Sequence, residues 1–186
     1  FRSGCSNLAA WHLARALWIS DKRNLNRFET LQAFYSIGAR ELERELVPLM
    51  RDQRIGLLVW SPLAGGLMSG KFTREGQGPQ DARRAKFDFP PVDKERVFKV
   101  VDVMREIADA HNVSAARVAL AWLLHQPVVT SVIIGAKNSE QLEDNLSAPG
   151  LALSEVELAR LDEVSRLPEE YPGWMIDWQA KNRYPE

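Results

Sequence analysis

Residues 54–71 read RIGLLVWSPLAGGLMSGK, and the fold is decided by this stretch. Its first part, Ile55 to Val59, is a nearly continuous apolar run, which is typical of a strand covered on both faces. The run ends at Trp60-Ser61-Pro62, where proline removes a ladder donor, and Ala64-Gly65-Gly66 follows. We therefore predict a buried strand that opens into a glycine-rich loop.

This loop has a composition that suits a nucleotide. Glycines let backbone N–H groups approach a ligand closely, and Trp60 offers a flat apolar face at the carboxyl end of the strand. The pair would fit a cofactor that carries both an aromatic ring and phosphates. A glycine-rich loop is a weak motif, however, and a buried strand followed by a flexible turn explains the spacing equally well.

Short apolar runs alternate with helical patterns on both sides of this stretch. Apolar spacing and capping residues predict helices over residues 8–20, 41–50, 93–108, 114–124, 139–146 and 154–164. Further strands are expected over residues 28–33 and 128–134. Gly4 to Asn7 reads as the turn after another strand, with Asn7 capping the next helix. Residues 72–91 form a long loop, and residues 168–186 an extended tail that docks on the body.

The alternation of strand, loop and helix predicts an α/β fold with a parallel sheet, in a single domain over residues 1–186. A TIM barrel and a doubly wound sheet both fit, because each gathers the carboxyl ends of its strands at one edge. A (β/α)8 TIM barrel takes roughly 250 residues and eight strands. About four strands are expected here, so the sequence is similar to half a barrel.

Composition narrows the class of protein. The chain has 186 residues and a formal net charge of −1, so no basic excess points to nucleic acid. No apolar run approaches the ~20 residues of a membrane helix, and no membrane partner is expected. The single cysteine, Cys5, allows no internal disulfide and favours a reducing, cytoplasmic compartment. The three histidines share no ligand spacing, so no metal site is predicted. The start at Phe1 suggests a fragment.

Five motifs in order along the chain resemble those of the aldo-keto reductases. They are GCSN at 4–7, Gln32, WSPLAGG at 60–66, SGK at 69–71 and GAKNSEQLEDN at 135–145. The nearest branch is that of bacterial general oxidoreductases, which also resembles the potassium-channel β subunit. The resemblance covers essentially the whole chain. It implies a (β/α)8 TIM barrel of the aldo-keto reductase type, of which only about the second, carboxyl-terminal half is present.

The resemblance implies a cofactor, NADP (NADPH), and the residues that would hold it. For the nicotinamide end these are Ser6, Asn7 and Gln32 on the carboxamide and Trp60 on the ring face. For the pyrophosphate and riboses they are Ser61, Pro62, Leu63, Gly65 and Lys71, with Arg83 or Arg84 closing over them. For the adenosine end they are Gly135, Lys137 and Gln141 on the phosphate and Asp144 and Asn145 beside the adenine. A helix N-terminus with a nearby lysine suits a 2′-phosphate, which favours NADP over NAD.

The implied activity is reduction of aldehydes or ketones by hydride transfer, with a small-molecule carbonyl substrate. In that family the proton donor, a tyrosine, and its aspartate, lysine and histidine partners come from the amino-terminal half. Tyr35, Tyr171 and Tyr184 lie outside the tyrosine motif, so no catalytic residue is assigned. We expect this chain alone to be inactive and to need a complementing amino-terminal half.

One alternative stays open, namely a non-catalytic module for nucleotide sensing or subunit interaction. Unpaired sheet edges are templates for pairing, so a homo-oligomer is also expected.

Overall fold

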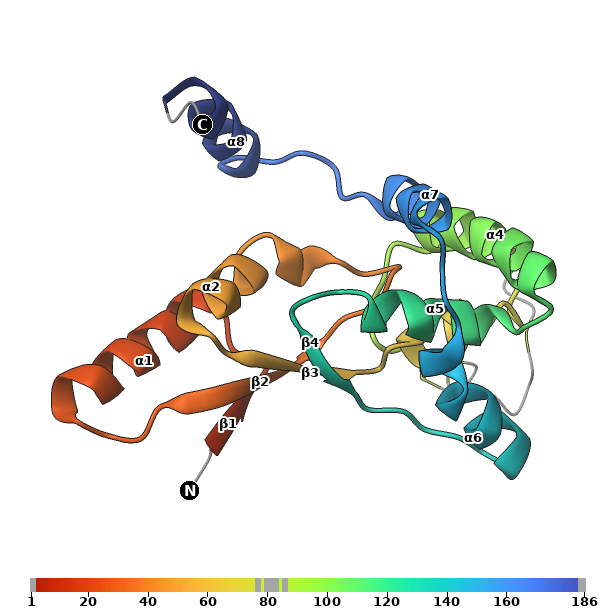
Figure 1. Cartoon of the computed structure of the whole chain (residues 1–186), viewed down its shortest axis with the longest axis horizontal. Coiled ribbons are helices and arrows are strands. Elements are labelled where there is room, and N and C mark those ends of the chain that lie inside the picture. Colours follow the sequence, from red (N-terminus) through yellow and green to blue (C-terminus); the bar gives the residue numbers. More distant parts are fainter. Residues whose placement is uncertain (1–2, 76–77, 79–83, 85–86, 184–186) are drawn as a thin grey trace.

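A computed structural model describes residues 3–75, 78, 84 and 87–183 of the chain. Its centre is a parallel sheet of four strands in the order β1-β2-β3-β4 (Figure 1). The strands are β1 (Ser3–Ser6), β2 (Phe28–Phe34), β3 (Gly56–Trp60) and β4 (Val129–Val132). The parallel α/β fold is confirmed. Within the described residues the sheet stays open and does not close into a barrel.

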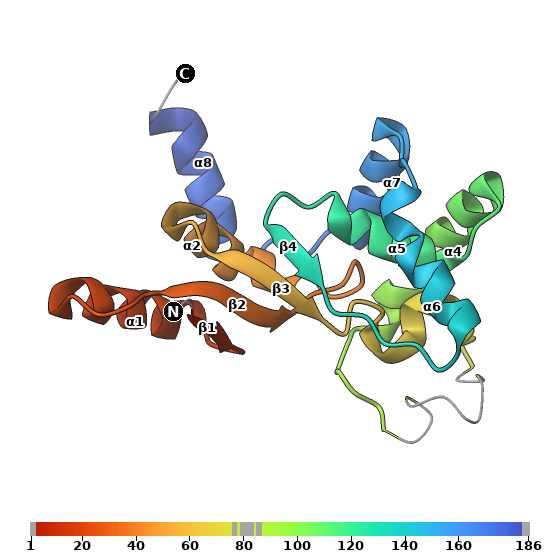
Figure 2. The same cartoon turned by 60° about the horizontal axis from the view of Figure 1, so that its bottom comes forward.

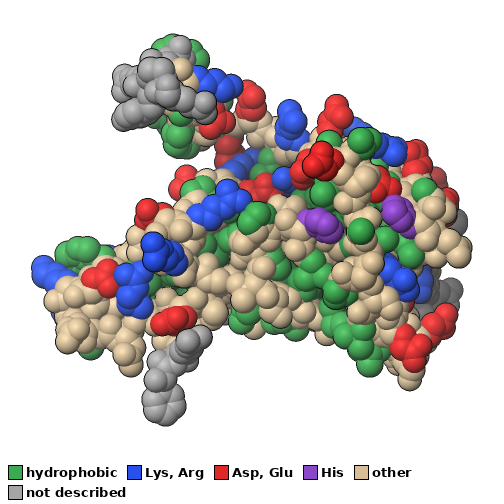
Figure 3. All heavy atoms as spheres, viewed as in Figure 1, with side chains coloured by type: hydrophobic (Ala, Val, Ile, Leu, Met, Phe, Trp, Pro, Cys, Tyr) green, Lys and Arg blue, Asp and Glu red, His purple; other side chains and the backbone are tan. Residues whose placement is uncertain are grey.

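Helices connect the strands and form two groups (Figure 1). The first group is α1 (Ala10–Arg23) and α2 (Leu46–Gln53), with the 3-10 turn η1 (Glu41–Glu43). The second is α4 (Lys94–His111), α5 (Ala115–Leu124), α6 (Ser139–Leu146) and α7 (Glu155–Ser165), with η2 (Ala64–Ser69) and η3 (Ala148–Gly150). Helix α4 packs on both α5 and α7. Charged side chains of both signs are scattered over the face that Figure 3 shows.

The sheet is covered on one face only, which corrects the expectation of a strand covered on both. Leu57 and Val59 of β3 are completely buried, but Leu58 between them is half-buried. The buried side chains join Leu13 of α1 and Met50 of α2 in the core. The apolar run was misleading because an apolar sequence does not show whether another element packs against each face of the strand. The described helices cover only one face of the sheet.

Helix starts that depend on local capping are confirmed. The side chain of Asp93 accepts from the backbone N–H of Arg96, and that of Ser114 from Arg117. Ser154 and Glu157 form a complete capping box.

The expected turn at Gly4–Asn7 was wrong, because Gly4 to Ser6 lie within β1. Helix α1 begins after Ala9 without a side-chain cap, so Asn7 is not its cap. The side chain of Asn7 instead bonds a residue of β3.

The tail is also different from the prediction, because Gly173–Arg183 form a helix, α8. Figures 1 and 2 show α8 set apart from the sheet and joined to α7 by an extended connection. The connection is held to the body by Arg44, which forms an ion pair with Glu170 at 2.6 Å. Residues 174–183 contain neither proline nor glycine, so helix formation is not opposed there.

Candidate functional site

The loop after β3 turns back sharply through left-handed backbone. Ser61, Ala64, Gly65 and Gly66 all have positive φ, at 50°, 49°, 67° and 99°. The hydroxyl of Ser61 accepts the N–H of Gly65 at 3.2 Å, which closes the turn. The predicted strand and glycine loop are therefore both present, and the loop is a turn of left-handed backbone that this hydrogen bond closes.

The carboxyl ends of the first three strands meet beside Trp60. The indole N–H of Trp60 donates to Oδ1 of Asn7 at 2.9 Å, which links β3 to the end of β1. The carbonyl of Gln32 accepts both the backbone N–H of Asn7 at 3.0 Å and the hydroxyl of Ser6 at 3.1 Å. These four predicted residues, from three separate segments, therefore form one bonded group.

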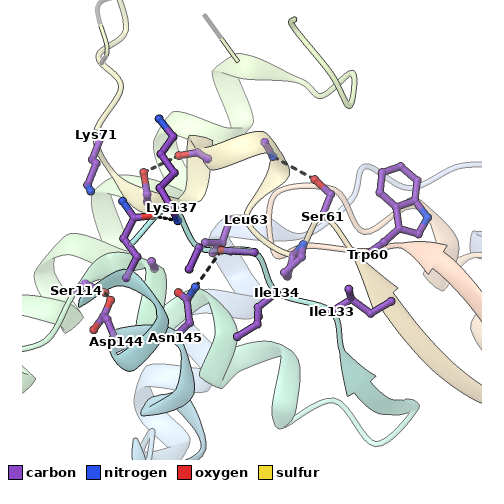
Figure 4. A pocket seen from close by; sticks show the side chains of 18 of the residues that line it. Trp60, Ser61, Leu63, Lys71, Ser114, Ile133, Ile134, Lys137, Asp144 and Asn145 are labelled. Carbon is purple, nitrogen blue, oxygen red and sulfur yellow. Dashed lines mark hydrogen bonds between the residues drawn. The ribbon is translucent and has the colours of Figure 1, made fainter. Parts of the chain in front are cut away.

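A cavity of about 790 Å³ extends from Trp60 to the start of α6 (Figure 4). Its lining includes most of the predicted residues: Trp60, Ser61, Pro62, Leu63, Gly65, Lys71, Gly135, Lys137, Gln141, Asp144 and Asn145. Ser6, Asn7 and Gln32 lie beside Trp60 and are not part of this lining. Arg83 is outside the described residues. The volume falls within the ordinary range of small-molecule and cofactor pockets.

The far end of the cavity is shaped by the segment that enters α6. Asn138 caps this helix by accepting the N–H of Gln141 at 2.9 Å. Of the expected capping box only this half is present, because the Gln141 side chain accepts from the N–H of Lys137 instead. Asn145 donates to the carbonyl of Gly135 at 3.3 Å. These bonds hold the segment in place.

Asp144 is engaged by two residues, Ser114 and Arg117, that were not predicted to belong to the site. Its Oδ1 accepts from Nε and Nη2 of Arg117 at 2.9 and 2.7 Å, and its Oδ2 accepts the Ser114 hydroxyl. Both partners come from the start of α5, some 30 residues earlier in the chain. No local pattern signals such a pairing. Its effect is to balance the negative charge of Asp144 at the cavity wall.

Aromatic residues of the long loop were also missed. The ring of Phe89 lies parallel to that of Trp60, with an interplanar angle of 6° and centroids 5.9 Å apart. Phe34 of β2 stacks on Trp60 too, at 5.0 Å and 30°. Phe89 and Phe72 both line the cavity. The loop has no apolar periodicity, so nothing in the sequence separated these rings from ordinary loop residues.

Arg84 fixes the long loop onto the glycine turn. Its side chain is only 4% exposed and forms an ion pair with Asp88 at 2.8 Å. It donates to the carbonyls of Ala64 at 2.7 Å and Pro90 at 2.9 Å. The hydrogen bond from Lys94, with the charge of Arg84, holds the pKa of Asp88 below its usual value. Arg84 thus links the long loop to the glycine turn through hydrogen bonds to backbone carbonyls of both.

The described part of the chain contains neither a candidate metal site nor a helix that could span a membrane. No group of three His, Cys, Asp or Glu residues there is placed to hold a metal ion. Within the same residues, every helix is too short or too polar to cross a membrane. Cys5 packs against the core, and burial raises the pKa of its thiol although a backbone hydrogen bond opposes this.

Comparison with known proteins shows which family this chain belongs to. Residues 2–166 match the model of the Aldo/keto reductase family. An uncharacterized oxidoreductase of Bacillus subtilis is 37% identical over 87% of the chain and 48% of its own length. An NADH-specific methylglyoxal reductase of Escherichia coli is 32% identical over 89% and 49%. A probable voltage-gated potassium channel subunit beta of Arabidopsis thaliana is 31% identical over 92% and 55%. The chain spans about half the length of these relatives.

Proposed function

Because the chain belongs to the aldo/keto reductase family, we propose that it is the cofactor-binding half of an NADP-dependent reductase of aldehydes or ketones. The observation that carries this proposal is the continuous cavity that extends from Trp60 to the start of α6. It joins an aromatic ring, a turn of left-handed backbone and two lysines in one space. A dinucleotide carries a flat ring at one end and phosphates along its length, and so matches this order of features.

The residues present fit such a cofactor. Lys71 and Lys137 line the cavity, and Asp144, the acidic side chain among the described lining residues, is paired with Arg117. The phosphates of a bound dinucleotide would therefore meet positive charge. At the other end, Asn7 fixes the plane of Trp60 through the indole N–H, so that ring is held ready to stack. The bound cofactor would supply the hydride, and the chain's own residues orient it.

Proton donation is the part of the reaction that we assign to residues outside this sequence. Tyr35 is completely buried and donates its hydroxyl proton to Glu43 at 2.5 Å, away from the cavity lining. Burial and the Glu43 carboxylate raise the pKa of Tyr35, which opposes its ionisation. We therefore expect the 186-residue chain alone to bind nucleotide without reducing a carbonyl. A cytoplasmic location fits its lone cysteine.

The choice of NADP over NAD rests on positive charge near the start of α6. One similar protein is an NADH-specific reductase, so the preference has to be measured in this chain. We would titrate the purified chain with NADPH and with NADH by calorimetry. A variant, Lys137→Ala, is expected to lose about fivefold in NADPH affinity, the size of one partly exposed charge contact, and little in NADH affinity.

The matched control is Lys99→Ala, which removes the same charge from the exposed face of α4. It should change neither affinity by more than about twofold. Equal loss of NADPH affinity in both variants would show that Lys137 acts only through the overall charge of the chain and not through a contact with the cofactor. Absence of binding by the folded wild-type chain would refute the proposed function. Nucleotide binding with no carbonyl reduction, even after a complementing half is added, would favour a nucleotide-sensing module.

A further inference from the structure

Trp60, on which we expect the nicotinamide to stack, is already in contact with two other aromatic rings. Trp60 already stacks with Phe34 at 5.0 Å and with Phe89 at 5.9 Å. Phe89 comes from a short strap, residues 87–90, which follows Arg84 in the long loop. Phe87 stacks in turn on Phe89, at 5.4 Å. The ring that we expect to hold a nicotinamide is thus already in contact with a ring of the chain itself.

The backbone of this strap is anchored on both sides. Arg84 donates to the carbonyl of Pro90 and forms an ion pair with Asp88. Lys94, at the start of α4, bonds the other oxygen of Asp88 at 2.8 Å. A Cβ on Gly65 would lie 2.6 Å from the carbonyl oxygen of Phe89, so the strap rests directly on the glycine turn. Its backbone is held against the loop that forms the cavity.

The side chain of Phe89 is held much less firmly than the backbone. It is 39% exposed, and Phe87 is 56% exposed. Rotation of the Phe89 ring into solvent would leave the anchors at Arg84 and Gly65 in place. The main cost of that rotation is the loss of its aromatic contacts. The strap therefore combines a fixed backbone with a ring that can leave Trp60.

We propose that Phe89 is a gate on the nicotinamide subsite, whose ring occupies Trp60 in the free protein and is displaced when a dinucleotide binds. The inference rests on the proposed function, because it assumes that the nicotinamide stacks on Trp60. Affinity for the whole dinucleotide is then reduced by the fraction of molecules in which Phe89 covers Trp60. Figure 4 shows Lys137, Asp144 and Asn145, at the adenosine end, on the opposite side of the cavity from Trp60. A ligand that binds only at the adenosine end should therefore not lose this affinity.

Two ligands separate these ends in one experiment. NADPH needs the whole cavity, whereas 2′,5′-ADP has no nicotinamide and needs only the adenosine end. Removing the gate by Phe89→Ala should raise NADPH affinity about twofold to tenfold, the range of one aromatic pair. Affinity for 2′,5′-ADP should stay within about twofold. Calorimetry suits the measurement because the chain holds six tryptophans, which blur a fluorescence change.

Two further variants control the interpretation. Phe89→Leu keeps an apolar side chain without the ring and should give a smaller gain. It also serves if the alanine variant folds poorly, which circular dichroism would show. Phe87→Ala removes a ring that contacts Phe89. It should raise NADPH affinity less than Phe89→Ala does.

Each outcome is decisive. Weaker or unchanged NADPH binding by both Phe89 variants would overturn the gate, because the ring would then support the cofactor or be irrelevant to it. The same change for both ligands would also overturn it, since the effect would not be confined to the nicotinamide end. If wild-type chain binds neither ligand, the proposed function itself fails and the gate fails with it.

Discussion

Gly65 is the position where the structure makes its sharpest prediction about stability. Its φ of +67° lies in the left-handed region, where a residue with a Cβ loses about 1–2 kcal/mol. An added Cβ would also lie 2.6 Å from the carbonyl oxygen of Phe89, which is backbone and cannot rotate away. Overpacking of this kind costs about 1–3 kcal/mol. Gly65→Ala should therefore lower the free energy of unfolding by roughly 2–5 kcal/mol.

Gly70 offers a matched control for the backbone part of this loss. Its φ of +73° is similar, but the nearest atom to its added Cβ is Nε of Arg105 at 3.3 Å, in a flexible side chain. Gly70→Ala should thus lose only about 1–2 kcal/mol. The assay is urea unfolding followed by circular dichroism. At a slope of roughly 2 kcal/mol per molar, a difference of about 2 kcal/mol separates the midpoints by about 1 M. Equal midpoints for the two variants would refute the close contact between the strap and Gly65.

Three further predictions concern caps and charges. Asp93→Ala removes the cap of α4 and should lower the free energy of unfolding by about 1 kcal/mol in urea unfolding; no loss would show that the cap is dispensable. The backbone N–H of Ser154 donates to Glu157 and holds the pKa of that carboxyl below its ordinary value of 4.5, so the stabilisation from this bond is present above pH 4.5 and is lost as pH falls through the folded pKa. Glu157→Gln should flatten the fall in stability on acidification from pH 6 to 3, and an unchanged profile would assign that fall to other carboxylates. Arg40→Met leaves the partly buried Glu43 without its two-nitrogen partner and should lower the free energy of unfolding by about 2–4 kcal/mol, whereas a loss under about 1 kcal/mol would show that water replaces the ion pair.

Features that depend on neighbours a few residues apart could be predicted from the sequence. The strand before the glycine loop and the caps at Asp93, Ser114 and Ser154 are of this kind. A cap needs only a suitable side chain and an N–H about three residues later, so its pattern is readable in the chain. The order of the motifs likewise led to the family, because each motif is a local string of residues.

Contacts between distant segments could not be read in this way. Asn7 was expected to cap a helix, yet its side chain bonds Trp60, which lies 53 positions later. Asp144 is paired with Arg117, and Phe89 leaves an aperiodic loop to stack on Trp60. Each of these depends on which segments the sheet and helices bring together.

Interactions between residues close in sequence and packing between distant segments therefore determine different features of this protein. The sequence by itself determined the alternation of strands and helices and the glycine turn, because hydrogen bonding and apolar spacing within a few residues specify them. The cavity residues that were expected came from the resemblance to the aldo-keto reductases, and Phe72 and Phe89 of the lining were not among them. Only the tertiary structure decided that the sheet is covered on one face, that Asn7 fixes Trp60 and that a strap rests on Gly65. Those features arise from packing between segments far apart in the chain, and the energy of such packing depends on three-dimensional proximity that no local pattern contains.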